Sequence, residues 1–187
     1  IPITPLLTAL GVGGLAVALA LQPTLSNLFA GITIIAAKNM HTGDFVRLES
    51  GDDGYIVDIS WRSTKIRALS NKLILIPNNK LADSIVNNFS KPENELSLLV
   101  GVGVSYSSDL EKVERVTIEV ASEAMVANEG AVPGFQPFIR YNKFDAYSIN
   151  FNVIMRVKSY TDQFLLQHDF IKRLHARYRI EGIEIPF

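Results

Sequence analysis

The sequence contains no cysteine, which excludes a disulfide framework and any zinc or iron–sulfur site held by cysteine thiolates. It also carries no charge over its first 37 residues, because all 18 Lys and Arg and all 19 Asp and Glu lie from Lys38 onward. The net charge of −1 argues against a basic nucleic-acid-binding protein. A hydrophobic content of 48% with so small a net charge excludes a disordered chain.

The uncharged N-terminal stretch predicts a membrane-spanning helix. Residues 3–21 contain only Thr4 and Thr8 as polar side chains, and as a helix they would be about 28 Å long, close to the bilayer core of about 30 Å. A buried helix of a soluble protein and a signal peptide are the alternatives, but the basic n-region of a signal peptide is missing. Because the chain begins abruptly, we expect a fragment of a longer membrane protein.

Small residues lie on two opposite faces of this predicted helix. At 100° per residue they fall into two sectors: Gly11, Gly14 and Ala18 in one, and Ala9, Gly13, Ala16 and Ala20 in the other. Helices in lipid pack closely through small residues, so two opposed faces predict a neighbour on each side and a closed ring. Leu15 and Leu19 then point into or out of the ring, and inward-pointing leucines form a hydrophobic constriction. Chance alignment in a Gly/Ala-rich helix is the alternative.

Gln22 and Pro23 interrupt the apolar run. Proline has no amide hydrogen to donate to the Leu19 carbonyl and clashes with it, so we expect the helix to kink or end here. A second helix is predicted over residues 24–37, with an amphipathic pattern suited to the membrane interface or to packing on the soluble region. Lys38 begins the charged region, which favours a cytoplasmic location for the rest of the chain.

Residues 38–92 predict a small β domain. Short apolar or alternating runs indicate strands at residues 45–48, 55–61, 63–69 and 73–76, and a phase shift in the third run indicates a bend or bulge. Four or five short strands in so short a segment suit a small barrel-like (Sm-like) sheet. Such a sheet is near the lower size limit for independent stability, so packing against other copies would help it.

Residues 93–187 predict a ferredoxin-like α/β domain. The expected order is strand, helix, strand, strand, helix, strand, with a last strand at residues 183–185. Asp109 is predicted to cap the first helix, which runs to about Met125, and Thr161 or Asp162 the second, which runs to about Tyr178. The apolar side of the second helix is expected to hold Phe164, Leu165, His168, Ile171 and His175.

No catalytic or metal-binding pattern is present. The phosphate-binding, dinucleotide-binding, zinc-protease and serine-hydrolase motifs are all missing. His168 and His175 lie seven residues apart without a third ligand at suitable spacing, so partly buried structural histidines are the preferred interpretation. Arg140 with Tyr141 and Phe151 matches acylphosphatase or RNA-binding chemistry only poorly. We therefore expect no enzyme, metal, cofactor or nucleic-acid partner.

Five short motifs resemble the small-conductance mechanosensitive channel (MscS) family, in order and at the right separations across nearly the whole chain. They are residues 14–22 (GLAVALALQ), 25–28 (LSNL), 30–31 (AG), 43–44 (GD) and 76–78 (IPN). The resemblance implies a homoheptamer in the inner or plasma membrane, whose third transmembrane helix lines the pore above a hollow cytoplasmic cage with side portals. It further implies opening by membrane tension under hypoosmotic shock, with release of ions and small osmolytes.

Matching by position implies residue roles. Leu15 and Leu19 match the pore-sealing leucines of the family. The helix-packing surface matches Gly11, Gly14, Ala16 and Ala18. The kink or hinge matches Gln22, Pro23, Asn27 and Gly31. Pro23 replaces the family's kink glycine, which implies a more permanent bend. The family's first two transmembrane helices, which sense tension, and its closing C-terminal strand lie outside this sequence. The alternative function is a membrane-anchored oligomeric scaffold or ligand-sensing module without a pore.

Overall fold

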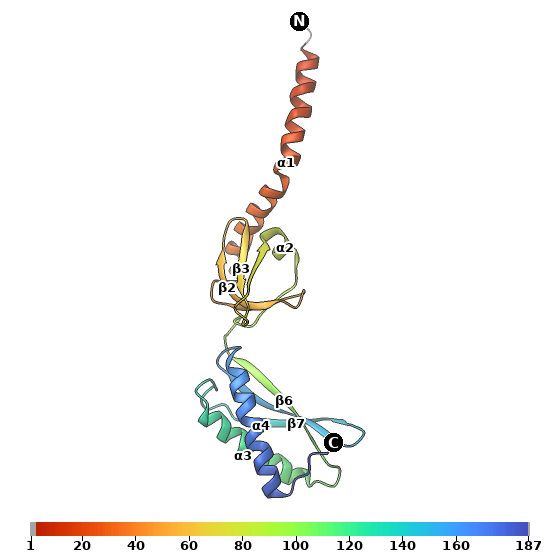
Figure 1. Ribbon diagram of the computed structural model, residues 1–187, viewed down its shortest axis with the longest axis vertical. Coiled ribbons are helices and arrows are strands. Elements are labelled where there is room, and N and C mark those ends of the chain that lie inside the picture. Colours follow the sequence, from red (N-terminus) through yellow and green to blue (C-terminus); the bar gives the residue numbers. More distant parts are fainter. Residues whose placement is uncertain (1–2, 187) are drawn as a thin grey trace. The chain divides into compact units, whose positions relative to one another are not determined.

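The structure is a computed structural model that describes residues 3–186, except for the side chain of Leu6. It divides into two compact units, and the boundary along the chain falls between Lys91 and Pro92. The first unit holds a long helix and a five-stranded sheet, and the second holds a three-stranded sheet with two helices (Figure 1).

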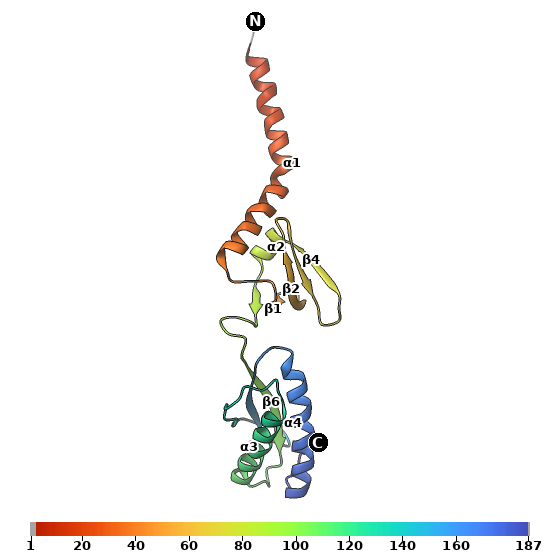
Figure 2. The same cartoon turned by 90° about the vertical axis from the view of Figure 1, so that its left-hand side faces the viewer.

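One continuous helix, α1 (Thr4–Ala37), forms the N-terminal part of the first unit. The prediction of a second, separate helix after Pro23 is therefore wrong, because Pro23 lies inside α1. Figure 2 shows the axis of α1 changing direction in its C-terminal part, so the interruption is a kink and not an end. A proline removes only one backbone donor, whereas ending the helix would leave four carbonyls and four amides without helical partners.

The sheet of the first unit is antiparallel, with strand order β4-β3-β2-β1-β5. Its elements are β1 (Phe45–Leu48), β2 (Asp53–Ile59), β3 (Ser63–Arg67), β4 (Leu73–Pro77), helix α2 (Asn78–Asp83) and β5 (Val86–Asn88). Strands are found at all four predicted positions. The expected irregularity is a register shift in β2 between Ile56 and Asp58, opposite β3, and not a bend in the third strand itself.

The core of the first unit joins α1 to the sheet. Its fully buried members include Val46, Ile56 and Ile66 from the strands and Leu81 from α2. Ile34 of α1 belongs to the same cluster and is 6% exposed. The C-terminal part of α1 is therefore packed on the sheet domain, whereas the N-terminal part is not.

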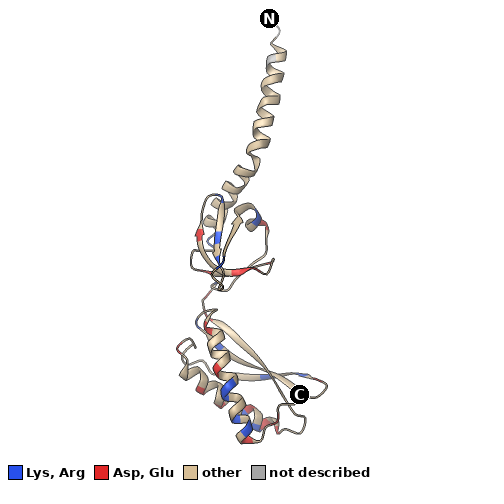
Figure 3. Ribbon diagram, viewed as in Figure 1, with Lys and Arg blue, Asp and Glu red and all other residues tan. Residues whose placement is uncertain are grey.

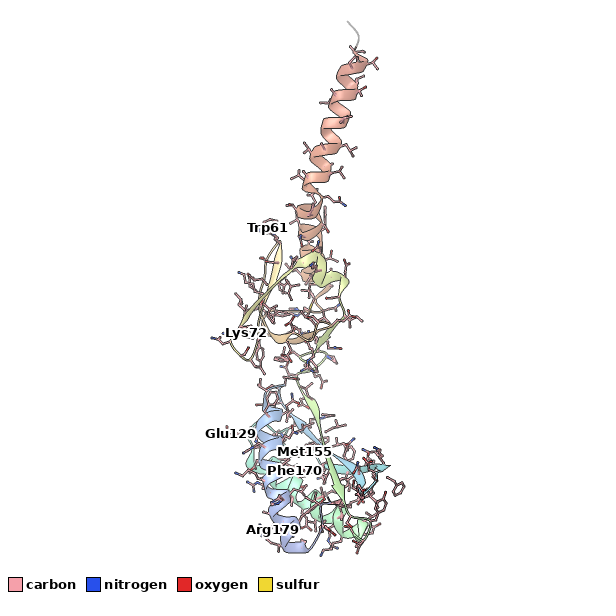
Figure 4. The ribbon with its side chains drawn as sticks, turned by 45° about the vertical axis from the view of Figure 1, so that its right-hand side comes forward. Trp61, Lys72, Glu129, Met155, Phe170 and Arg179 are labelled. Atoms are coloured by element: carbon pink, nitrogen blue, oxygen red, sulfur yellow. The ribbon has the colours of Figure 1, made fainter. Side chains whose placement is uncertain are left out.

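The second unit has the strand order β6-β8-β7, all antiparallel. Its elements are β6 (Leu96–Val104), α3 (Leu110–Ala127), β7 (Phe138–Phe144), β8 (Ile149–Val157) and α4 (Asp162–Glu181). Alternate side chains of β8 are buried along its whole length, because the two helices cover one face of the sheet. Met155 and Phe170 meet in this core (Figure 4).

The last predicted strand, at residues 183–185, is absent. One backbone hydrogen bond joins this segment to the end of β6, from the Ser105 amide to the Glu184 carbonyl at 3.1 Å. Pro186 has no amide hydrogen and cannot extend a ladder, so the segment is too short to form a strand. The described part of the second unit is thus a ferredoxin-like fold with three of its four strands.

Helix α3 begins as predicted. The Asp109 side chain accepts hydrogen bonds from the backbone amides of Glu111 at 3.1 Å and Lys112 at 3.3 Å. These bonds satisfy two of the donors that every helix start leaves without an intrahelical partner. The helix runs two residues beyond Met125, to Ala127.

The predicted apolar side of α4 is wrong. The buried residues are Leu166, Phe170, Leu174 and Tyr178, whereas His168 and His175 are exposed and Phe164, Leu165 and Ile171 are 51%, 63% and 47% exposed. The helix carries apolar residues on two faces, so periodicity alone does not select one. The buried face also holds Tyr178, whose hydroxyl lies 2.5 Å from the buried Thr117 hydroxyl of α3. Burial raises the pKa of Tyr178 to about 12, against the opposing effect of that hydrogen bond, so the phenol stays neutral.

We predict that Phe170→Ala lowers the free energy of unfolding by about 3–5 kcal/mol, because it leaves a cavity in a fully buried site. The adjacent Ile171→Ala is the control and should change it by less than about 0.5 kcal/mol, since Ile171 is exposed. Urea titration of the protein in detergent, followed by circular dichroism, measures both. Equal losses in the two variants would contradict the assigned face of α4.

Candidate functional site

The N-terminal part of α1 exposes large apolar side chains all around the helix. Leu15 and Leu19 are 61% and 60% exposed, and Leu7, Leu10, Val12 and Val17 are exposed to a similar or greater degree. Exposing one such side chain to water costs about 1.5–3 kcal/mol relative to burying it. This segment therefore requires an apolar surrounding, either lipid or other protein chains.

The small residues predicted to pack against neighbours have no contact within the chain. A Cβ added to Gly11, Gly13 or Gly14 would meet no described atom within 4 Å, and Ala16 and Ala18 are exposed. Both faces are open in the single chain, and each can accept another helix. Their packing role stays a prediction, as does the sealing role of Leu15 and Leu19.

The length of the unpacked part of α1 matches a bilayer. From Thr4 to Ser26, before the first residue that docks on the sheet domain, the helix rises about 33 Å, against a hydrocarbon core of about 30 Å. Within residues 3–186, α1 is the one helix long and apolar enough to cross a membrane. Figure 3 shows it free of Lys, Arg, Asp and Glu along its length.

Asn27 links the kink to the sheet domain. It is 8% exposed, and its Nδ2 donates a hydrogen bond to the Pro23 carbonyl at 2.9 Å. Its Oδ1 accepts from the backbone amide of Asn79 in the first turn of α2, at 3.0 Å. One side chain thus connects the proline carbonyl to α2. The side chains of Gln22 and Pro23 are exposed, and Pro23 takes part in this contact through its backbone carbonyl alone.

Gly31 lies one turn further along and permits a close approach of α1 to the sheet domain. A Cβ at this position would lie 2.5 Å from Nδ2 of Asn78 and 2.9 Å from the carbonyl oxygen of Trp61. Both distances are shorter than van der Waals contact allows, so glycine is required here by packing. Its predicted flexibility as a hinge is a separate proposal, which this contact does not need. We call the contacts of Asn27 and Gly31 with residues 60–61 and 78–79 the helix–sheet joint.

Asn78 holds the sheet side of the joint in place. It is fully buried, and its Nδ2 donates to the Ser60 carbonyl at 2.7 Å while its Oδ1 accepts from the Thr64 hydroxyl at 2.9 Å. Its backbone amide donates to the Arg62 carbonyl at 3.0 Å. Asn78 and Asn79 have no role predicted from the sequence, although the Ile-Pro-Asn motif at residues 76–78 includes the first of them.

The described residues contain no group of three His, Cys, Asp or Glu side chains placed to hold a metal ion. The features that stand out in residues 3–186 are an exposed apolar helix of membrane length, a kink, and a buried polar joint to a sheet. Such an arrangement defines a class of membrane protein in which a soluble domain is joined firmly to a membrane-spanning helix.

Comparison with known proteins identifies the class and then the family. Residues 23–91 match the family model described as mechanosensitive ion channel, beta-domain, and residues 98–185 match mechanosensitive ion channel MscS, C-terminal. The two matches follow one another along the chain, with residues 92–97 between them, and together cover most of it. The chain belongs to the MscS family of mechanosensitive ion channels, which are membrane proteins.

Named relatives support the same family assignment. The chain is 34% identical over 187 residues to the small-conductance mechanosensitive channel MscMJ of Methanocaldococcus jannaschii, covering 99% of the chain and 52% of the relative. It is 37% identical over 191 residues to the large-conductance channel MscMJLR of the same organism, with the same coverage. The chain thus spans about half the length of these relatives.

Solved structures confirm the fold. The closed-state crystal structure of Helicobacter pylori MscS superimposes with a TM-score of 0.82 at 27% identity, covering 100% of this chain and 72% of that one. Arabidopsis thaliana MSL1 gives 0.73 at 16% identity, covering 100% of this chain and 67% of that one, which supports the fold alone. The expected combination of an apolar helix, a β domain and an α/β domain is confirmed.

We predict that Gly31→Ala loosens the helix–sheet joint, because the new methyl group overlaps the side chain of Asn78. This effect opposes the gain of about 1 kcal/mol that alanine brings to a helix. Hydrogen exchange at the amides of Asn78 and Asn79 should become faster. Gly13→Ala is the control, since a Cβ there meets no described atom within 4 Å, and it should leave these amides unchanged. Equal exchange in both variants would contradict the close approach.

Proposed function

We propose that this chain supplies the pore helix and the cytoplasmic part of a homoheptameric channel that membrane tension opens. The channel lies in the inner or plasma membrane, belongs to a protein with further transmembrane helices, and releases ions and small osmolytes on hypoosmotic shock. The observation that carries the proposal is the exposed apolar N-terminal part of α1, which has small residues on two open faces, while the C-terminal part of the same helix forms a buried joint to the sheet domain.

Two open small-residue faces suit a closed ring of α1 helices. In lipid, apolar side chains give little drive for association, and close packing through glycine and alanine supplies it. If each helix has a neighbour on each side, the copies form a closed ring when the rotation angle between neighbours is a whole fraction of a full turn. Leu15 and Leu19 then face the axis as two stacked apolar rings, which exclude water and ions from a narrow pore.

Tension can open such a ring because the work it does is proportional to the in-plane area gained. Tilting or outward movement of the N-terminal part of α1 increases that area and separates the leucine rings. The joint, which Asn27 and Gly31 form, anchors the C-terminal part of α1, so the movement is taken up at the kink just before it, near Gln22 and Pro23. Pro23 keeps a bend there in every state, since its missing amide cannot restore the hydrogen bond to Leu19.

Patch recording under suction tests the function with the full-length protein. We expect pressure-activated conductance that is absent from membranes without the protein. Absence of conductance at all pressures would overturn the channel proposal. Mass measurement in detergent separates it from a membrane-anchored scaffold or ligand-sensing module: seven copies support the channel, and a dimer supports the module.

We predict that Leu19→Ser makes the channel leaky, because a polar side chain at the constriction favours its wetting. Growth of cells that produce this variant should slow, and its pressure threshold should fall. The control is Leu21→Ser, the same substitution about 200° around the helix, which should leave growth and threshold unchanged. Unchanged growth and threshold in Leu19→Ser would contradict the assigned gate.

A further inference from the structure

Trp61 is the single tryptophan of the chain, and it is 55% exposed. It lies in the turn between β2 and β3, which the Ser60 and Ser63 backbones close with a 3.0 Å hydrogen bond. Figure 4 shows it at the end of the sheet domain near α1, whereas Lys72, in the turn between β3 and β4, lies toward the other end. A large exposed indole in a tight turn has no role in the core of the sheet.

The helix–sheet joint fixes this turn beside α1. The Trp61 carbonyl is 2.9 Å from the Cβ position of Gly31, and the Arg62 carbonyl accepts the Asn78 amide at 3.0 Å. Lys80 follows Asn79, whose amide binds Asn27. Trp61, Arg62 and Lys80 therefore gather around α1 at residues 27–31. We call these three residues the collar patch.

The collar patch lies at headgroup depth when α1 spans a bilayer. The uncharged stretch at residues 3–21 fills the hydrocarbon core, and Asn27 is about 9 Å further along the helix. The kink brings the following residues closer to the membrane plane than a straight helix would (Figure 2). The polar region of each leaflet extends about 5–8 Å beyond the hydrocarbon, which the long side chains of the patch can reach.

The charge of the collar patch suits an anionic surface. α1 itself carries no charge, and Arg62 and Lys80, both exposed, directly follow the joint residues Trp61 and Asn79 along the chain. Neither side chain forms an ion pair within residues 3–186, whereas Lys65 in the neighbouring strand pairs with Asp58 at 3.0 Å. Phe29 and Ile32 of α1 are also exposed, at 63% and 55%. Tryptophan beside basic residues is the composition typical of a membrane interface on the cytoplasmic side.

We propose that the collar patch binds the anionic lipid headgroups of the adjacent leaflet, with Arg62 and Lys80 on phosphate oxygens and the Trp61 ring among the glycerol and carbonyl groups. The proposal rests on α1 spanning the membrane as in the proposed function. It gives the sheet domain its own attachment to lipid, in addition to the helix.

Trp61 is its own reporter in a fluorescence experiment on the full-length protein. Wild type and Trp61→Phe are reconstituted in phosphatidylcholine vesicles with and without phosphatidylglycerol, and their difference gives the Trp61 emission. Headgroup spin-labelled lipid and aqueous iodide serve as the two quenchers. We expect blue-shifted emission, strong quenching by spin-labelled lipid and weak quenching by iodide, with the contrast increasing with phosphatidylglycerol and decreasing with added salt.

Charge variants test the role of the basic residues. A basic residue near an anionic surface favours contact by a factor of about five, so Arg62→Gln and Lys80→Gln should each lower the ratio of lipid-contacted to free Trp61 by about fivefold. Lys72→Gln, which removes an exposed lysine in the turn between β3 and β4, is the control and should have no effect.

Three outcomes would overturn the proposal. Strong quenching by iodide without quenching by spin-labelled lipid would place the patch in water. Blue-shifted emission that neither quencher reaches, in vesicles and in detergent alike, would place it against a second copy of the chain. Failure of the protein to float with the vesicles would contradict the membrane placement of α1 and, with it, the patch; flotation without lipid quenching overturns the patch alone.

Discussion

The close approach of Gly31 to Asn78 is the contact on which the rest of the first unit depends. This contact joins the membrane-length helix α1 to its sheet domain. Only a residue without a side chain lets the backbone of α1 come so close to the carbonyl of Trp61. Asn78 fills the space that Gly31 leaves and uses its amide to bind Ser60 and Thr64, so the joint is both packed and fully hydrogen-bonded. Asn27 extends the same network to the carbonyl of Pro23.

This joint divides α1 into two parts with different surroundings. The N-terminal part has no contact with the sheet and needs lipid or other chains, whereas Ile34 belongs to the core of the sheet domain. Pro23 lies near the boundary between these two parts. The backbone hydrogen bond to Leu19 that it lacks therefore belongs to the unpacked part and leaves the packed part intact. The free part is thus connected to the sheet through the buried polar groups of the joint and through the apolar core that contains Ile34.

Much of the fold can be predicted from local sequence signals. Short apolar or alternating runs predicted the positions of β1 to β4, and Asp109 predicted the start of α3, because these signals depend on neighbours within one element. The apolar side of α4 could not be predicted, since both of its faces carry apolar residues and the choice depends on the distant Thr117. The continuity of α1 through Pro23 and the roles of Asn78 and Asn79 also depend on contacts across the chain. The leucines and small residues of α1 stay predictions, because their surroundings are other molecules.

The hydrogen bonds of Asn78 restrict how the sequence of the helix–sheet joint can change in evolution. A side chain larger than hydrogen at position 31 requires a smaller one at position 78, but a smaller one leaves the Ser60 carbonyl and the Thr64 hydroxyl without their partner. Single substitutions at either position are therefore unfavourable, and the two positions together with the turn between β2 and β3 must change as a set. Related chains should show covariation among these positions, and a chain with a different residue at position 31 should also have a rebuilt turn.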